Sequence, residues 1–165
     1  DRTVSRGLGD VYKRQVMDLM IKNNTYYVPT ISAGEFVAAK SKIDNYFPEI
    51  VRPKAASVGP QIGATFKKAH ERGVMIAFGT DAGVQPHGTN ADEFIFMVKY
   101  GMSPMRAIKS ATINTAKLLK INNDLGSIEV GKTADLIAVK GNPLSDIKNI
   151  RNVKFVMTDG KQIIF

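Results

Sequence analysis

A short, uninterrupted run of apolar residues lies near the middle of the chain, from Val74 to Phe78, and a glycine closes it. Such a run is typical of a strand buried on both faces, as in a parallel sheet. The pattern predicts a second strand over Tyr26–Val28, ended by Pro29. Between them we expect a helix over Gln61–Arg72, with Gly73 as its C-terminal stop. Strand, helix and strand at this spacing predict a βαβ crossover and therefore a parallel pair.

The alternation of polar and apolar positions predicts helices on both sides of this unit. We expect them over Val16–Ile21, Ala91–Tyr100 and Met105–Ala111, with one more beginning near Asn114. Asn90 and Glu93 have the spacing of a capping box for the second of these helices, and Ser103-Pro104 is a typical start for the third. The segment Ile31–Val58 lacks clear periodicity and is broken by two prolines. It is predicted to be a long loop or lid on the substrate side.

Beyond residue 121 the pattern changes to short strands. These are predicted over Ser127–Val130, Asp135–Val139, Val153–Met157 and Gln162–Phe165. Thr158–Lys161 is predicted to be a two-residue hairpin turn, because the Asp-Gly pair at its centre suits positive φ angles. Parallel βα units followed by an antiparallel tail indicate two structural layers.

Residues 1–15 differ from the rest of the chain, since they are rich in Gly and Arg and show no periodicity. The stretch VSRGLGDVYKRQ resembles a peptide translated from adapter sequence at the end of an assembled gene fragment. We therefore expect a non-native tail, with a disordered native tail as the alternative. The parent gene upstream of Val16 would decide between the two.

Composition narrows the function classes. The chain of 165 residues has no cysteine and only two histidines, which excludes disulfides, thiolate zinc sites and a cysteine nucleophile. The net charge of +8, from 23 Lys+Arg against 15 Asp+Glu, raises the hypothesis of a nucleic-acid-binding module. Because the basic residues are dispersed, we favour a solvated surface and expect neither a nucleic-acid nor a membrane partner. The composition does not determine the cellular compartment of the protein, and the cytoplasm is slightly favoured.

The pentapeptide Gly79–Gly83 places a carboxylate, Asp81, just beyond the C-terminal end of the predicted strand Val74–Phe78. In α/β barrels and open parallel sheets this edge carries the chemistry. A carboxylate there can bind Zn²⁺ and accept a proton from water that the metal activates. A turn aspartate bonded to its own loop backbone is the alternative, and the spacing alone leaves both open.

The two histidines are the other candidates for chemistry. His87, between Pro86 and Gly88, is a candidate substrate contact, acid/base group or metal ligand, with a surface-loop histidine as the alternative. His70 lies in a predicted helix four residues after Phe66. That position favours a partly buried histidine with a hydrogen-bonded ring over a catalytic one.

Four segments together carry a family resemblance: GTDAG, PHGTN, EFIFMVKYGMSPMRAIKSATINTAKLL and LGSIEVGKTADLIAVKGNPLSDI. In this order they resemble the C-terminal part of the amidohydrolase superfamily, in its imidazolonepropionase-like and Xaa-Pro dipeptidase-like branch, from about Val16 to Phe165. The resemblance implies an α/β fold: the C-terminal part of a metal-dependent (β/α)8 TIM barrel plus part of a small β-sandwich domain. Residues 16–121 would form the last βα units of the barrel, and residues 122–165 the C-terminal strands of the sandwich.

The resemblance also implies a chemistry: hydrolysis of an amide bond, in a cyclic non-peptide amide or a dipeptide, with one or two divalent metals such as Zn²⁺. Asp81 matches the aspartate after the eighth barrel strand, a metal ligand and proton acceptor, and His87 matches a histidine that faces the small-molecule substrate. The resemblance leaves a homo-oligomer open. Four residues match a sandwich motif that serves folding: Gly126, Gly131, Ala134 and Asp135.

Several family features have no counterpart here, and all of them would precede Val16. They are a His-x-His pair, a bridging lysine and two later metal-binding histidines. A catalytic zinc normally needs three protein ligands. The alternative hypothesis is therefore a catalytically inactive half-domain with a structural or binding role, whose two barrel strands leave an open sheet edge.

Overall fold

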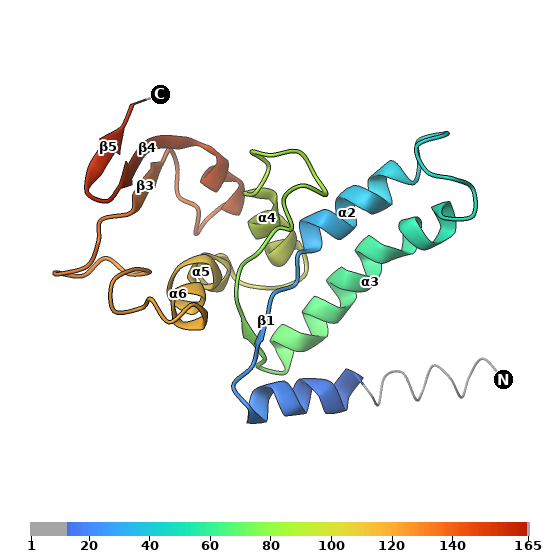
Figure 1. Cartoon of the computed structure of the whole chain (residues 1–165), viewed down its shortest axis with the longest axis horizontal. Helices are drawn as coiled ribbons and strands as arrows, with labels where there is room; N and C mark the ends of the chain where they lie inside the picture. The colour runs from blue at the N-terminus through green and yellow to red at the C-terminus, as the bar shows by residue number, and fades with distance from the viewer. Residues whose placement is uncertain (1–12, 165) are drawn as a thin grey trace.

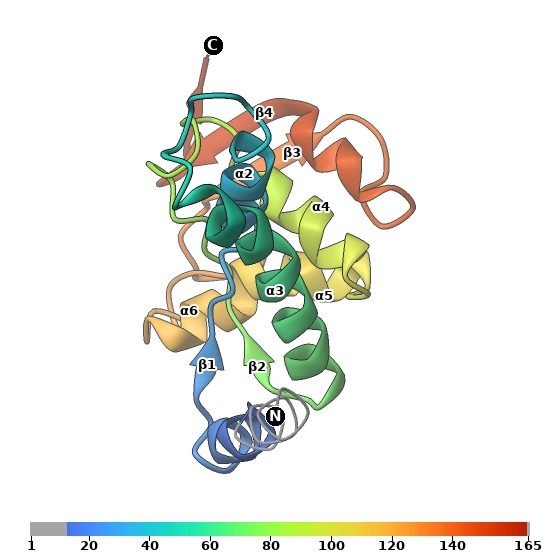
Figure 2. The ribbon, with the colours of Figure 1, turned by 90° about the vertical axis from the view of Figure 1, so that its right-hand side faces the viewer.

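Two short parallel strands form the part of the sheet that positions the site. The computed structural model describes residues 13–164, and in it β1 (Tyr26–Tyr27) pairs with β2 (Met75–Ile76). Figure 2 shows the two strands side by side. The predicted βαβ crossover is confirmed. Of the segment 1–15, expected to be non-native, only residues 13–15 are described, and they belong to a helix whose described part covers residues 13–22.

The prediction of a long irregular loop over Ile31–Val58 is wrong. This region contains α2 (Ile31–Lys40) and the start of α3 (Arg52–Glu71), which pack side by side as a helical hairpin (Figure 1). Pro53 does not interrupt α3, because it lies in the first turn, where the backbone N–H that proline lacks would have no intrahelical partner. The expected stop at Gly73 is present, with a φ of 90°.

The two helices of this hairpin approach one another at glycines. A Cβ added to Gly59 would lie 2.8 Å from the carbonyl oxygen of Gly34, and one added to Gly34 would lie 3.3 Å from the Gly59 Cα. Small residues on the facing sides therefore let the two backbones come into contact.

The hydrophobic core lies between β2, α3 and the helices that follow the strand. α4 spans Asp92–Lys99, α5 spans Pro104–Lys109, and a π-helical turn, η1 (Ser110–Asn114), leads into α6 (Thr115–Leu118). The buried apolar cluster consists of Met17, Ile31, Phe66, Ala69, Val74, Ile76, Met97, Met102 and Ala107. The predicted start of α5 is confirmed, because the Ser103 hydroxyl accepts a hydrogen bond from the Arg106 N–H at 3.4 Å. None of the helices within residues 13–164 is both long and apolar enough to cross a membrane.

The turn η1 covers the edge of β2 that faces away from β1. The Asn114 side-chain amide donates to the Ile76 carbonyl at 2.9 Å. The Phe78 N–H reaches both the Ser110 carbonyl, at 3.1 Å, and the Thr115 hydroxyl, at 3.2 Å. These hydrogen bonds cover part of the edge, but no strand among residues 13–164 pairs with this side of β2 or with the outer side of β1, as expected for an open sheet edge. The Ser110 carbonyl at the start of this π-helical turn thus bonds to the chain two residues beyond the end of β2.

The C-terminal part forms an antiparallel sheet in the order β3 (Leu136–Val139), β4 (Val153–Thr158), β5 (Lys161–Ile163). It lies at the end of the molecule away from the helix of residues 13–22 (Figure 1). The hairpin turn is confirmed, with Asp159 and Gly160 both at positive φ. Phe165, the last residue of a predicted strand, lies outside the described residues.

The predicted strand over Ser127–Val130 is not formed. Ile128 and Val130 are strongly exposed, and no strand among residues 13–164 pairs with them. Ala134 and Asp135, from the predicted sandwich motif, do stabilise the fold. The Asp135 carboxylate accepts a hydrogen bond from the Asp159 N–H at 2.7 Å, and the Ala134 carbonyl accepts one from the Gly160 N–H. These contacts hold the β4–β5 turn against the start of β3.

Candidate functional site

The candidate site is the loop of residues 79–90, which leaves the C-terminal end of β2 and leads to α4. Its first residue has a steric role, because a Cβ added to Gly79 would lie 2.5 Å from a methyl carbon of Val28, which follows β1. The glycine therefore lets the ends of the two parallel strands approach. This edge of a parallel sheet is where βα loops carry chemistry.

We expect Gly79→Ala to lower the free energy of unfolding by about 1–3 kcal/mol, because the added methyl group overpacks the contact with the stiff Val28 side chain. Urea denaturation of the variant measures this. Adding Val28→Ala should recover part of the loss, as a double-mutant cycle would show. Equal stability of Gly79→Ala and the wild type would contradict the close approach.

Asp81 lies in a tight turn with its side chain exposed. Its φ of 51° is left-handed, a conformation that aspartate tolerates better than most residues. The turn is closed through the backbone, since the Val84 N–H donates to the Asp81 carbonyl at 3.1 Å. Within residues 13–164 no donor hydrogen-bonds or ion-pairs with the Asp81 carboxylate. The turn-aspartate alternative required such a bond to the loop backbone, and it is not made.

His87 is also exposed, six residues along the same loop. No hydrogen bond joins it to Asp81 in the described structure. Contacts elsewhere shape the loop: the Thr80 hydroxyl donates to the Asn90 side-chain oxygen at 3.4 Å, and the Thr89 hydroxyl donates to the Pro86 carbonyl at 2.7 Å. The loop thus carries both predicted site residues, with no hydrogen bond between their side chains in the described structure.

The described residues do not make a metal centre by themselves. Across residues 13–164 no three side chains of the His, Cys, Asp or Glu type lie close enough to hold an ion. Asp81 fits as a single ligand, because its carboxylate is exposed and uncommitted. The donor set among residues 13–164 is therefore incomplete for zinc, which normally takes three protein ligands in a catalytic site.

Glu93, three residues beyond the 79–90 loop, has a structural partner that differs from the one predicted. The predicted capping box is absent: α4 is preceded by Ala91, which offers no side-chain cap. The fully buried Glu93 carboxylate instead accepts the Ile31 N–H at 3.0 Å and the Ser32 N–H at 2.7 Å. It therefore caps α2, whose own preceding residue, Thr30, provides no side-chain bond. Burial raises the pKa of Glu93, while these hydrogen bonds oppose that rise.

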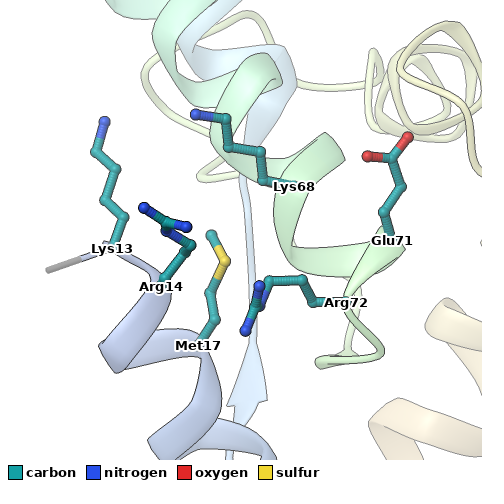
Figure 3. Close-up of a pocket in the computed structure, with 6 residues that line it drawn as sticks. All are labelled: Lys13, Arg14, Met17, Lys68, Glu71 and Arg72. Atoms are coloured by element: carbon teal, nitrogen blue, oxygen red, sulfur yellow. The ribbon is translucent and has the colours of Figure 1, made fainter. Parts of the chain in front are cut away.

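One cavity lies away from the loop that holds Asp81, and another is lined in part by residues of that loop. The first, of about 350 Å³, opens between the helix of residues 13–22 and the end of α3, and Figure 3 shows Lys13, Arg14, Met17, Lys68, Glu71 and Arg72 around it. It lies near the N-terminal ends of the strands, the side of a barrel that serves stability. The second, of about 370 Å³, lies beside the 79–90 loop and is lined in part by Ser32, Gln85 and Pro86. Neither is lined by Asp81.

His70 is buried in α3 with its ring 5.3 Å from that of Phe66. The expected burial is confirmed, but the expected hydrogen-bonded ring is not, since neither ring nitrogen has a partner among the described residues. Burial, and then the nearby positive charge of Arg106, lowers the pKa of His70. His70 is therefore a buried residue of α3, outside the 79–90 loop.

This burial predicts a pH dependence of stability. The pKa of His70 is lower in the folded chain than the unfolded value of about 6.5, so the unfolded chain binds the extra proton first. The free energy of unfolding should therefore fall as the pH drops below about 6.5, with a slope of at most about 1.4 kcal/mol per pH unit for one proton. Urea denaturation between pH 7.5 and 5.5 measures it. In His70→Phe that part of the slope should vanish; an unchanged slope would assign it to other groups.

Comparisons with known proteins agree on one family. The sequence model of the Amidohydrolase family matches residues 2–163. A solved Xaa-Pro dipeptidase with methionine in its active site is 70% identical, with a TM-score of 0.88, over 92% of this chain and 37% of that one. Ochratoxinase from Aspergillus niger is 35% identical over 144 residues, which are 86% of this chain and 29% of its own length. Imidazolonepropionase from Fusobacterium nucleatum is 37% identical over 78 residues, 44% of this chain and 18% of its own. The chain thus spans about three tenths of the length of the ochratoxinase it matches.

Proposed function

Because the chain belongs to the amidohydrolase family, we propose that it is part of a metal-dependent enzyme that hydrolyses amide bonds, with Asp81 as a metal ligand and proton acceptor. The observation that carries this proposal is the exposed, unpaired Asp81 carboxylate at the C-terminal end of β2. The reactive groups of TIM-barrel enzymes come from this edge. The relatives named above include hydrolases of carbon–nitrogen bonds, which supports the reaction class.

In this proposal Asp81 holds and moves a proton. Its carboxylate would take the proton from the attacking water and pass it to the leaving nitrogen, as a general base and then a general acid. His87, on the same loop, would contact the substrate. Members of the family generally bind divalent metals, and a bound Zn²⁺ would supply an activated water. The described residues hold no complete ligand set, so no step of the reaction is assigned to the metal.

Among substrates, a dipeptide is favoured over a cyclic amide. The relative with 70% identity over most of this chain is an Xaa-Pro dipeptidase, whereas the imidazolonepropionase match covers less than half of it. The test is hydrolysis of a panel of Xaa-Pro dipeptides and cyclic amides by the full-length protein, before and after removal of metal with a chelator and return of Zn²⁺. We expect zinc-dependent cleavage of the dipeptides. No cleavage of any amide by the zinc-loaded protein would contradict the proposal.

A second candidate is that the 165-residue chain alone is an inactive structural or binding half-domain. It is favoured by the incomplete ligand set among residues 13–164. We expect the isolated chain, dialysed against Zn²⁺ and then against buffer, to retain far less than one equivalent of metal and to cleave no substrate. Stoichiometric, tightly held zinc, measured by elemental analysis, would count against this candidate.

A further inference from the structure

A buried chain of hydrogen bonds connects α4, α2 and the 79–90 loop. It begins at the Glu93 carboxylate, which accepts the backbone N–H groups of Ile31 and Ser32. It continues at Ser32, whose side-chain oxygen accepts a hydrogen bond from the Gln85 amide at 3.0 Å. All three side chains are buried, with exposed fractions of 0% for Glu93, 1% for Ser32 and 6% for Gln85.

Gln85 differs from its neighbours in the loop. The residues on both sides of it, 81–84 and 86–88, are exposed, so Gln85 is the point at which the tip of the loop enters the protein. Its backbone also organises the turn that contains Asp81: the Gln85 carbonyl accepts the Gly83 N–H at 3.2 Å, and Gln85 forms an isolated bridge with Ala82. A bond that fixes the Gln85 side chain therefore restrains the Asp81 turn.

The stability of α4 does not explain why a carboxylate is buried at position 93. A buried carboxylate is costly unless several donors satisfy it. Glu93 meets this cost with the free N–H groups at the start of α2, where the helix dipole also favours negative charge. The result is a fixed start of α2, and Ser32 at that start holds Gln85.

We propose that Glu93 and Gln85 are positioning residues for hydrolysis, Glu93 by fixing Ser32 at the start of α2 and Gln85 by anchoring the Asp81 turn to Ser32. This inference rests on the proposed function. A displacement of about 1 Å of a reacting group can cost about 100-fold in rate. Loss of the anchor should thus lower kcat far more than it raises KM.

The test uses the full-length protein with the variants Gln85→Leu and Ser32→Ala, which break the same bond from its two ends. We expect each to lower kcat by about 10- to 100-fold with KM changed less than threefold, and the double variant to be no worse than the poorer single one. Tyr100→Phe is the matched control, because it removes a hydrogen bond to Glu35 of the same helix and leaves the buried chain intact. It should keep wild-type kcat.

Glu93 is tested by comparison of two substitutions. Glu93→Gln keeps one acceptor oxygen for the α2 amides and should retain more of kcat than Glu93→Ala. If Glu93→Ala fails to fold, the Gln85 and Ser32 variants still test whether the buried hydrogen bonds position the Asp81 turn. Wild-type kcat in both of them, while Asp81→Asn is inactive, would overturn the positioning role and leave the proposed function standing.

Hydrogen exchange supplies a readout that needs no activity. In Gln85→Leu and Ser32→Ala the Gly83 and Val84 amides should exchange at least 10-fold faster than in the wild type, while amides in the middle of α3 keep their rates. Unchanged exchange of the Gly83 and Val84 amides would overturn the anchoring role of Gln85, whether or not the full-length protein hydrolyses an amide. A failure to hydrolyse any amide would contradict the proposed function alone.

Discussion

Asp81→Asn in the full-length protein should reduce amide hydrolysis by at least about 1,000-fold, with the fold retained. General base catalysis alone contributes about 100- to 10,000-fold, and the substitution also removes a charged metal ligand. Asparagine has nearly the same shape and tolerates the left-handed conformation of residue 81 at least as well as aspartate. Because the carboxylate has no partner among the described residues, the substitution breaks no structural bond.

Steady-state kinetics with the preferred dipeptide measures this effect, and thermal denaturation verifies the fold. Asp124→Asn is the matched control: it makes the same change of charge at another exposed turn aspartate, which belongs to the segment after α6 and not to the 79–90 loop. It should leave kcat within about twofold of the wild type. Near wild-type turnover by Asp81→Asn would remove Asp81 from the catalytic machinery.

Local patterns were enough to predict the elements whose signals lie within a few residues. The run Val74–Phe78 followed by glycine gave the position of β2 and of the Asp81 turn, because a buried parallel strand needs continuous apolar residues. Asp159-Gly160 gave the β4–β5 hairpin, because few other residues accept two successive positive φ angles. In both cases the residues that form the structure are adjacent in the sequence.

The elements that sequence reasoning missed depend on residues far apart. α2 was not predicted, because most of its buried residues are small and give no strong apolar period. These residues are Ile31, Ser32, Ala33, Gly34 and Ala38. Glu93 was assigned to its own helix, since a capping box requires only local spacing, whereas its partners lie 61 and 62 residues away. The link from Ser32 to Gln85 spans 53 residues and could not be predicted without the fold.

Tyr100 provides another long-range contact, and it makes Gly63 a position where we expect a large loss of stability. The Tyr100 ring lies against Gly63 in the middle of α3, and a Cβ added to Gly63 would overlap the ring. The Tyr100 hydroxyl donates to Glu35 at 2.6 Å, and Lys99 also reaches that carboxylate, at 3.0 Å. Burial and the bond to Glu35 raise the pKa of Tyr100 to about 12, so its hydroxyl remains a donor at neutral pH.

Gly63→Ala therefore sets two effects against each other. Alanine is favoured over glycine inside a helix by about 1 kcal/mol, which would stabilise α3. Overpacking a rigid, tethered ring costs up to about 3 kcal/mol, because neither the helix backbone nor the ring can move freely. We expect the second effect to win, with a net loss of about 2 kcal/mol in the free energy of unfolding, measured by urea denaturation.

Two variants separate the contributions to this result. Ala64→Gly, at an exposed position of the same helix, reports the helix propensity alone and should cost about 1 kcal/mol. In a Tyr100→Ala background, Gly63→Ala should no longer destabilise and should instead gain the propensity term, so the sign of its effect reverses. If Gly63→Ala stabilises the protein while Tyr100 is present, the ring does not occupy the space above Gly63. Such a result would contradict the packing of Tyr100, which follows α4, against Gly63 of α3.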